Sequence, residues 1–224
     1  MLGFSVLAGI LVTVMVTPAL ALTSVTASNG IGIFESLPET LVIGEQPQEN
    51  RIIATNAAGE DVVIATVYSQ NREEVAWDEV SQFVKDATVA GEDRRFYEHG
   101  GVDIQGVIRA ALKNTVEGDV ASGASTLSMQ FVKNVFIQRA LQLDTEDERE
   151  KALEEAQRTK LDRKLKEMKL AIGLEKVYKK EEILLAYLNI AGFGGNTYGI
   201  EAAAQRYYGV SAAEVNLAQA ALTP

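Results

Sequence analysis

Four short segments of the chain gather the side chains that could do chemistry, and the first lies between Glu92 and Asp103. It holds carboxylates, arginines, aromatic rings and the only histidine, His99, directly after a predicted helix. One carboxylate here could serve as a general base if partial burial beside the aromatic rings disfavours its charged form. The alternative is a capped helix end whose arginines pair with neighbouring acids.

The second segment, residues 123–134, opens a predicted helix with small hydroxyl residues and places Lys133 two turns further on. Backbone N–H groups at the start of a helix bind anions, and hydroxyl groups beside them add donors. This pattern predicts an anion site. The alternative interpretation is an ordinary helix N-cap formed by Ser122 or Ser125.

The third segment contains Arg163 and Glu167, whose spacing places a guanidinium and a carboxylate on one helix face, with Lys160 and Lys164 beside them. Fixed cations that include a forked arginine suit a pyrophosphate group. A surface salt bridge is the plainer interpretation of the same spacing.

The fourth segment begins at Lys180, continues through Tyr187 and Asn189, and ends in a glycine-rich loop at 192–199. A loop of this kind between two helices could line a groove. Because the segment offers no nucleophile and no obvious acid, helix packing with a C-cap is the plainer interpretation.

The elements that must position these segments are mostly helical. Two runs rich in Ile, Val and Thr flank Asn56 to Gly59, which predicts a β-hairpin over residues 51–68. The first helix is expected from Trp77, with Asp78 in its first turn. Helices are predicted at 77–91, 103–117, 124–138, along a charged stretch from 144 to 178, at 181–190, and twice more after the glycine loop. In the charged stretch the predicted apolar face comprises Leu161, Leu165, Met168 and Ile172, and the acids at 144–155 should face solvent.

The N-terminal segment, residues 1–23, carries no charge and is long enough for a transmembrane helix, which needs roughly 20 apolar residues. We expect an uncleaved anchor because no basic region precedes the apolar run. A signal peptide cleaved after Ala19-Leu20-Ala21 is the alternative, and either one exports the rest of the chain. Residues 24–50 have the composition of a linker, and residues 51–224 are expected to form the main domain.

Composition excludes several classes of function. A formal net charge of -10 argues against a nucleic-acid partner, because such proteins usually present a basic face. The chain has no cysteine, which excludes disulfides, thiolate zinc sites and thiol nucleophiles. With one histidine, a metal site built from several histidines is also excluded.

Taken together and in order, the four segments resemble the peptidoglycan glycosyltransferases, glycosyltransferase family 51, over roughly residues 60 to 222. The motif Glu-Asp-x-x-Phe-x-x-His-x-Gly is met at Glu92, Asp93, Phe96, His99 and Gly101. The later motifs are met by Gly123, Ser125, Thr126, Gln130, Lys133 and Asn134, by Arg163, Lys164 and Glu167, and by Lys180, Ile183, Leu184, Tyr187, Leu188 and Asn189. Departures are Ala124, Met129, Gly192 and a longer acidic stretch between Lys133 and Arg163.

The resemblance implies an α-rich, lysozyme-like lobe and a smaller lobe that dips into the bilayer. It also implies an inverting transfer in which lipid II accepts the growing glycan and undecaprenyl pyrophosphate leaves. Glu92 would be the base, and Glu167 would orient the cations or a divalent ion such as Mg²⁺ or Mn²⁺. Substrate and pyrophosphate would be bound by Asp93, Ser125, Thr126, Gln130, Lys133, Asn134, Arg163 and Lys164. Structural roles would fall to Phe96, His99, Lys180, Tyr187 and Asn189.

The implied setting is the outer face of the cell membrane, with a single-pass anchor, membrane lipid as a neighbour and the divisome or elongation machinery as partners. A transpeptidase domain would follow in a bifunctional penicillin-binding protein, and the chain would lack the end of the glycosyltransferase domain. Two other classes stay open at this point: a lytic, lysozyme-like enzyme that cuts finished wall, and an anchored scaffold without activity.

Overall fold

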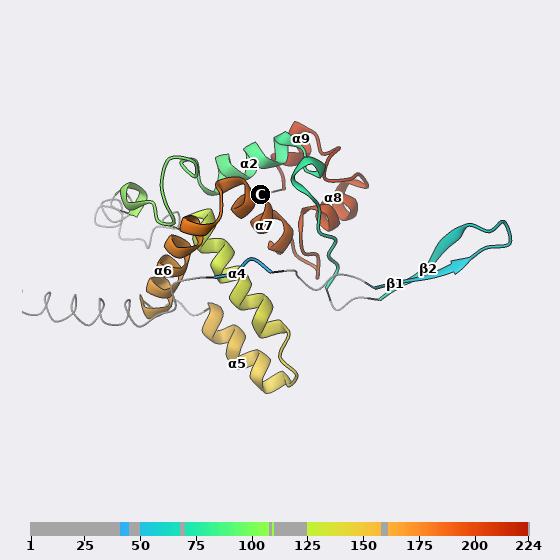
Figure 1. Cartoon of the computed structure of the whole chain (residues 1–224), viewed down its shortest axis with the longest axis horizontal. Coiled ribbons are helices and arrows are strands. Elements are labelled where there is room, and N and C mark those ends of the chain that lie inside the picture. The colour runs from blue at the N-terminus through green and yellow to red at the C-terminus, as the bar shows by residue number, and fades with distance from the viewer. Residues whose placement is uncertain are drawn as a thin grey trace, which may run out of the picture.

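The computed structural model describes residues 41–44, 50–67, 70–107, 109, 125–157 and 161–223 of the chain. The helices gather into one body and the β-hairpin projects away from it (Figure 1). The expected anchor, most of the linker, Lys160, Gly123, Ala124 and much of the helix expected at 103–117 lie outside the described residues. Within the described part, no helix combines the length and the apolar character that a membrane crossing requires.

The predicted hairpin is confirmed as strands β1 (Asn50–Thr55) and β2 (Asp61–Val67), paired antiparallel with an irregularity between Ile52 and Ile53. Its turn is built by Asn56, whose side-chain oxygen accepts from the backbone N–H groups of Ala58 at 2.8 Å and Glu60 at 3.0 Å. Gly59 adopts a φ of 83°, which explains the glycine at the turn.

The first helix starts later than the sequence predicts. Trp77–Glu79 form a 3-10 turn, η1, and helix α2 runs over Gln82–Glu92. Ser81 is extended, and its hydroxyl accepts from the N–H of Val84, so it is the N-cap. The expected start at Trp77 is therefore wrong, and Asp78 lies in the 3-10 turn rather than in the helix. The helix still ends where predicted and delivers Glu92.

Helix α4 (Leu127–Leu141) forms the centre of the body, where it packs against α5 (Glu146–Gln157), α6 (Leu161–Val177) and α7 (Lys180–Ile190). Its buried residues lie on several sides of the helix, as a central position requires. The most deeply buried core side chains include Phe96, Leu127, Phe131, Leu170, Leu174, Ile183, Leu184 and Ile200.

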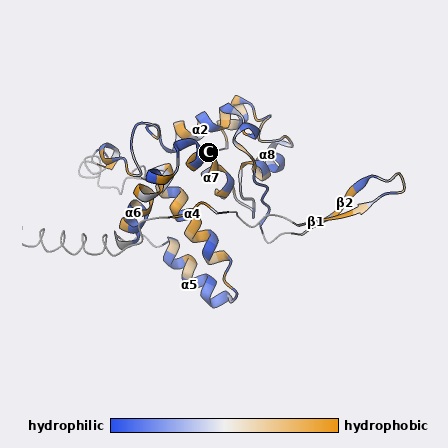
Figure 2. Cartoon of the chain, viewed as in Figure 1, coloured by the Kyte–Doolittle hydropathy of each residue, from blue (hydrophilic) through white to orange (hydrophobic). Residues whose placement is uncertain are grey.

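The charged stretch from 144 to 178 is described as two helices, and α5 is largely hydrophilic and exposed, as predicted (Figure 2). The predicted apolar face of α6 is correct at Met168, which packs partly buried against the core, and wrong at Ile172. Ile172 is exposed, whereas Glu167, Leu170, Ala171 and Leu174 are buried. The inward face combines a carboxylate and small residues with two leucines, so hydrophobic spacing alone does not identify it. Gly101 approaches this face so closely that a Cβ there would lie 2.3 Å from the carbonyl carbon of Ala171.

After α7 the glycine loop folds back onto residues near the start of the body. Asn71 donates from its N–H to the Asn196 carbonyl at 3.1 Å and accepts from the N–H of Tyr198 at 2.9 Å. Gly199 has a φ of 81°, and a Cβ there would lie 2.9 Å from the Asn189 carbonyl oxygen. The two predicted later helices are α8 (Ile200–Tyr208) and the short α9 (Leu217–Ala220).

Residues 41–44 have no regular structure but lie against the helical body. Leu41 is 5% exposed and belongs to the core, and the N–H of Ile43 donates to the Tyr178 hydroxyl at 3.2 Å. The chain is thus tied to the domain before the hairpin begins.

Candidate active site

Glu92 lies at the C-terminal end of α2, partly exposed, and faces side chains from α4 and α7. The Gln130 amide donates from Nε2 to Glu92 Oε2 at 2.8 Å. The Tyr187 hydroxyl donates to Gln130 Oε1 at 3.4 Å. Burial and then the charge of Glu92 raise the pKa of Tyr187 to about 12, so this phenol stays protonated at physiological pH. Three separate sequence motifs therefore meet at one carboxylate.

A second group of side chains forms a small cationic pocket of about 230 Å³ between α4 and α6. Its lining comprises Ser125, Met129, Gln130, Lys133, Asn134, Arg163, Lys164 and Glu167. Every motif residue that the sequence assigned to pyrophosphate binding, apart from Asp93 and Thr126, lines this pocket.

Two cations of this pocket, Arg163 and Lys164, contact Glu167. Arg163 donates to its Oε1, and Lys164 Nζ lies 3.5 Å from its Oε2. Lys164 also donates to the Ser125 hydroxyl. Glu167 is only 2% exposed, so the interpretation as a surface salt bridge is wrong. This buried carboxylate therefore holds the Arg163 guanidinium and the Lys164 ammonium at the wall of one pocket.

Burial lowers the pKa of Lys164, and the positive charges of Arg163 and Lys133 lower it further. Three cations therefore repel one another in a partly buried space. A multiply charged anion bound there would relieve this repulsion.

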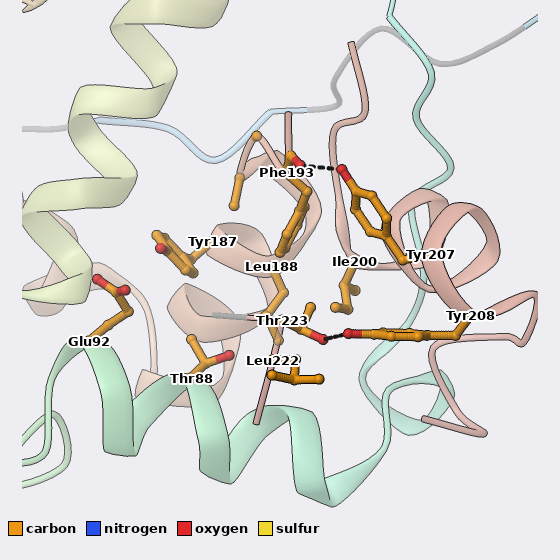
Figure 3. Close-up of a pocket in the computed structure, with 12 residues that line it drawn as sticks. Thr88, Glu92, Tyr187, Leu188, Phe193, Ile200, Tyr207, Tyr208, Leu222 and Thr223 are labelled. Atoms are coloured by element: carbon orange, nitrogen blue, oxygen red, sulfur yellow. Dashed lines mark hydrogen bonds between the residues drawn. The ribbon is translucent and has the colours of Figure 1, made fainter. Parts of the chain in front are cut away.

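Glu92 also lines a larger cavity of about 700 Å³ (Figure 3). Glu92 and Tyr187 lie at one end of it, and Tyr207 and Tyr208 from α8 lie at the other. The Tyr207 hydroxyl donates to the Phe193 carbonyl at 2.6 Å, which holds the glycine loop against the cavity wall. Gly192 and Phe193 belong to the lining, so this loop does line a groove in addition to packing helices.

Gln130 joins the two spaces. It lines the cationic pocket, and its amide reaches Glu92 in the larger cavity. Glu92 and the cations thus lie on opposite sides of a single side chain, that of Gln130. This arrangement can take a proton from a group in the larger cavity while an anionic group departs into the cationic pocket.

Asp93 and Thr126, although predicted to contact substrate, find partners within the protein. Asp93 is 9% exposed, and its two oxygens lie 2.8 Å from His99 Nε2 and 3.1 Å from the N–H of Leu127. The Thr126 hydroxyl donates to the Gly101 carbonyl at 2.7 Å and accepts from the N–H of Met129 at 3.2 Å. Thr126 is therefore the N-cap of α4, and the expected cap at Ser122 or Ser125 is wrong. Contact of Asp93 and Thr126 with substrate remains a prediction.

The remaining motif residues hold these elements together. Lys180 lies with Nζ 4.4 Å from the centre of the fully buried Phe96 ring and 2.7 Å from Glu175 Oε2. Glu175 in turn accepts from the Ser128 hydroxyl at 2.5 Å. The Asn189 side chain accepts from the N–H of Val75 at 3.3 Å and donates to its carbonyl at 3.0 Å.

The described residues do not supply a good resident site for a divalent cation. None of their His, Asp and Glu side chains form a group of three that could hold a metal ion. Among the described residues that line the cationic pocket, Glu167 is the one carboxylate, and both of its oxygens face cations. Lysine and arginine are not ligands for Mg²⁺ or Mn²⁺, so the donor set fits an anion better than a metal.

Sequence reasoning missed the far wall of the larger cavity. The residues of this wall to which the sequence assigned no role in the site are Thr88, Tyr207, Tyr208 and Leu222. The one feature of the sequence that could have indicated this wall is the aromatic pair Tyr207 and Tyr208 at the end of an alanine-rich helix. Nothing in the order of residues indicated that this pair lies across from Glu92.

The mainly helical body and the glutamate beside a cationic pocket fit a domain for glycosyl transfer, and comparison with known proteins agrees. The family model described as Transglycosylase matches residues 60–223, and the chain belongs to this family. It is 35% identical over 194 residues to penicillin-binding protein 1A of Aquifex aeolicus (strain VF5). The aligned residues cover 86% of this chain and 24% of the relative.

Two further relatives give the same result. Penicillin-binding protein 1F of Bacillus subtilis (strain 168) is 36% identical over 71% of this chain and 20% of its own length. Penicillin-binding protein 1A of Clostridium perfringens (strain 13 / Type A) is 34% identical over 89% of this chain and 28% of its own length. The chain thus spans between a fifth and somewhat over a quarter of the length of these relatives.

Proposed function

We propose that this chain polymerises lipid II into glycan strands of peptidoglycan, with release of undecaprenyl pyrophosphate. The proposal rests on one observation: a single side chain, that of Gln130, lies between Glu92 and the cationic pocket. A sugar hydroxyl that enters the larger cavity would meet a proton acceptor. The pyrophosphate of a second molecule would meet Lys133, Arg163 and Lys164.

In the proposed step Glu92 takes the proton of the acceptor 4-hydroxyl as that oxygen bonds to the anomeric carbon of the donor. The bond between this carbon and the pyrophosphate oxygen breaks, and its electron pair leaves with the pyrophosphate. Lys133, Arg163 and Lys164 stabilise the charge that develops there, and Glu167 fixes the arginine and the lysine of its own helix. Attack and departure on opposite faces of the sugar give inversion.

The remaining assignments concern the same site. Ser125 and Asn134 line the cationic pocket with neutral donors and are proposed to bind the phosphate oxygens, whereas Gln130 borders the pocket and donates to Glu92. A divalent cation, if it takes part, would arrive with the pyrophosphate, because the pocket offers one carboxylate that is already paired.

The proposed setting is the outer face of the cell membrane, with residues 1–23 as a single-pass anchor and residues 51–224 as the glycosyltransferase domain. The names of the relatives support a place in a penicillin-binding protein. That this protein is bifunctional and works with the division or elongation machinery is part of the proposal. A lysozyme-like fold of the α-rich lobe belongs to the same proposal.

A direct assay separates this proposal from a lytic enzyme. The protein is incubated with radiolabelled lipid II or, in parallel, with purified cell wall, and products are separated by size. We expect lipid II to be consumed into long glycan, with moenomycin blocking the reaction, and no soluble fragments from the wall. Release of wall fragments without consumption of lipid II would establish the lytic alternative instead.

A further inference from the structure

The contact between Tyr187, Gln130 and Glu92 has a consequence for the proposed function, on which this inference rests. We propose that Tyr187 is a positioning residue: by donating to Gln130 Oε1, it keeps the Gln130 amide turned toward Glu92 and away from the cationic pocket. Tyr187 would thereby fix the hydrogen bond that the proposed base receives, without touching Glu92 itself.

Gln130 has two competing environments. On one side its Nε2 donates to the Glu92 carboxylate at 2.8 Å. On the other it lines the pocket that contains Lys133 and Lys164, whose ammonium groups attract a carbonyl oxygen. A glutamine has rotatable side-chain bonds and could turn its Oε1 to these lysines, which would remove the N–H from Glu92. A restraint on Oε1 is therefore needed to hold the observed arrangement.

Tyr187 is suited to be that restraint. It lies on α7, a helix whose Ile183, Leu184 and Leu188 are fixed in the core, so its ring is held in place. Its hydroxyl remains a donor across the working pH range, because burial and the nearby Glu92 charge raise its pKa to about 12. The distance of 3.4 Å is long, as hydrogen bonds in an enzyme site without substrate often are.

The charged and titratable groups around Glu92 come from four further elements. In the cationic pocket beyond Gln130 these groups are Lys133 from α4 and Arg163, Lys164 and Glu167 from α6. In the larger cavity they are the phenols of Tyr187 from α7 and of Tyr207 and Tyr208 from α8. Within the described part of the chain, the Gln130 amide is the one side-chain donor that bonds to the Glu92 carboxylate. Loss of this N–H removes a donor that favours the charged form of Glu92.

The test measures glycan synthesis from lipid II against pH for the wild type and for Tyr187→Phe. We expect the acid limb of the profile of Tyr187→Phe to move upward by about 0.5–1 pH unit, as expected for the loss of one hydrogen bond to a carboxylate. Gln130→Met, which has similar length and no amide, should move the limb in the same direction. The double variant should move it no further than Gln130→Met alone, because Tyr187 acts through Gln130.

Tyr178→Phe is the matched control, because its hydroxyl contacts Ile43 and not the site, and its profile should coincide with that of the wild type. A fall in kcat for Tyr187→Phe with an unmoved acid limb would overturn the inference and leave a structural role. Additive shifts in the double variant would overturn it too, because they would mean that the two residues act independently.

A second measurement keeps this test separate from the proposed function. Titration of ¹³C-labelled glutamate carboxyl groups by NMR, with Glu92→Gln to assign the signal, reports the protonation of Glu92 without substrate. The Glu92 signal should titrate at higher pH in Tyr187→Phe, even if lipid II proves not to be the substrate. An unchanged titration would contradict the inference, and a wild type inactive on lipid II would contradict only the proposed function.

Discussion

At the scale of residues, the site depends on two carboxylates with opposite surroundings. Glu92 is partly exposed, beside a neutral amide and an open cavity, whereas Glu167 is buried between two cations. A carboxylate that already holds an arginine and a lysine is poorly placed to accept a proton from substrate. The surroundings therefore favour Glu92 as the base and Glu167 as the residue that orients the cations.

The lowered pKa of Lys164 gives a pH dependence that can be measured. An anion is bound by the protonated ammonium, so affinity should fall as pH rises through this pKa, which lies below the ordinary lysine value of 10.5. We expect the affinity for inorganic pyrophosphate, measured by calorimetry, to fall as the pH rises from neutrality. The fall should begin below pH 10.5, the ordinary pKa of lysine. Lys164→Met should lower the affinity about tenfold at neutral pH and remove this part of the pH dependence.

The control for this prediction lies on the same helix. Lys176 is exposed in the last turn of α6 and does not line the pocket, so Lys176→Met should bind pyrophosphate as the wild type does. Equal loss in both variants would mean that overall charge, and not the pocket, governs binding.

At the scale of elements, the first motif is held by a close contact with α6. A Cβ on Gly101 would lie 2.3 Å from the carbonyl carbon and 2.4 Å from the next backbone nitrogen, both in the chain of α6 at Ala171 and Ile172. Neither backbone atom can move without displacing the helix. This contact and the hydrogen bond from Thr126 to the Gly101 carbonyl set the distance between the motif loop, α4 and α6.

Gly101→Ala should therefore lower the free energy of unfolding by at least about 1–3 kcal/mol, since the added methyl overpacks a backbone contact. Chemical denaturation followed by circular dichroism measures this change. Gly100→Ala is the adjacent control: a Cβ there meets nothing within 4 Å, so its stability should stay close to that of the wild type. Equal effects of the two substitutions would show that the Gly101 contact is not tight.

The elements that the sequence predicted correctly are those determined by residues close together in the chain. The hairpin was found because Asn56 and Gly59 have recognisable turn chemistry, and the end of α2 was found from its apolar spacing. The start of α2 was missed because a 3-10 turn at Trp77 resembles a helix in spacing until Ser81 interrupts it. The inward face of α6 was predicted only in part, at Met168, because it also includes Glu167, whose burial depends on partners and not on hydrophobicity.

At the scale of the whole molecule, the candidate site is an assembly of distant residues. The family pattern named most residues of the cationic pocket, but it gave no indication that Gln130 divides two spaces. Nor could local spacing place Tyr207 and Tyr208 across a cavity from Glu92, because that depends on how α8 packs against the rest of the body.

The helical body should fold without support from the projecting hairpin. Ile64 in β2 is 64% exposed, whereas Ile183 in α7 is fully buried. Ile64→Thr should change the free energy of unfolding by no more than about 0.5 kcal/mol, and Ile183→Thr should lower it by about 2–4 kcal/mol. Thermal unfolding measures both, and a comparable loss in the two variants would show that the hairpin packs against something in solution.

The role of Glu92 is tested most directly by comparing glycan synthesis from lipid II by the wild type, Glu92→Gln and Glu98→Gln. Glu98 lies in the same motif loop, but its side chain is 70% exposed and does not line the cavity. If Glu92 is the base, Glu92→Gln should lose at least about a hundredfold in rate while it keeps its fold and its affinity for pyrophosphate, and Glu98→Gln should stay active. Near-normal synthesis by a folded Glu92→Gln protein would contradict the assignment of Glu92 as the base.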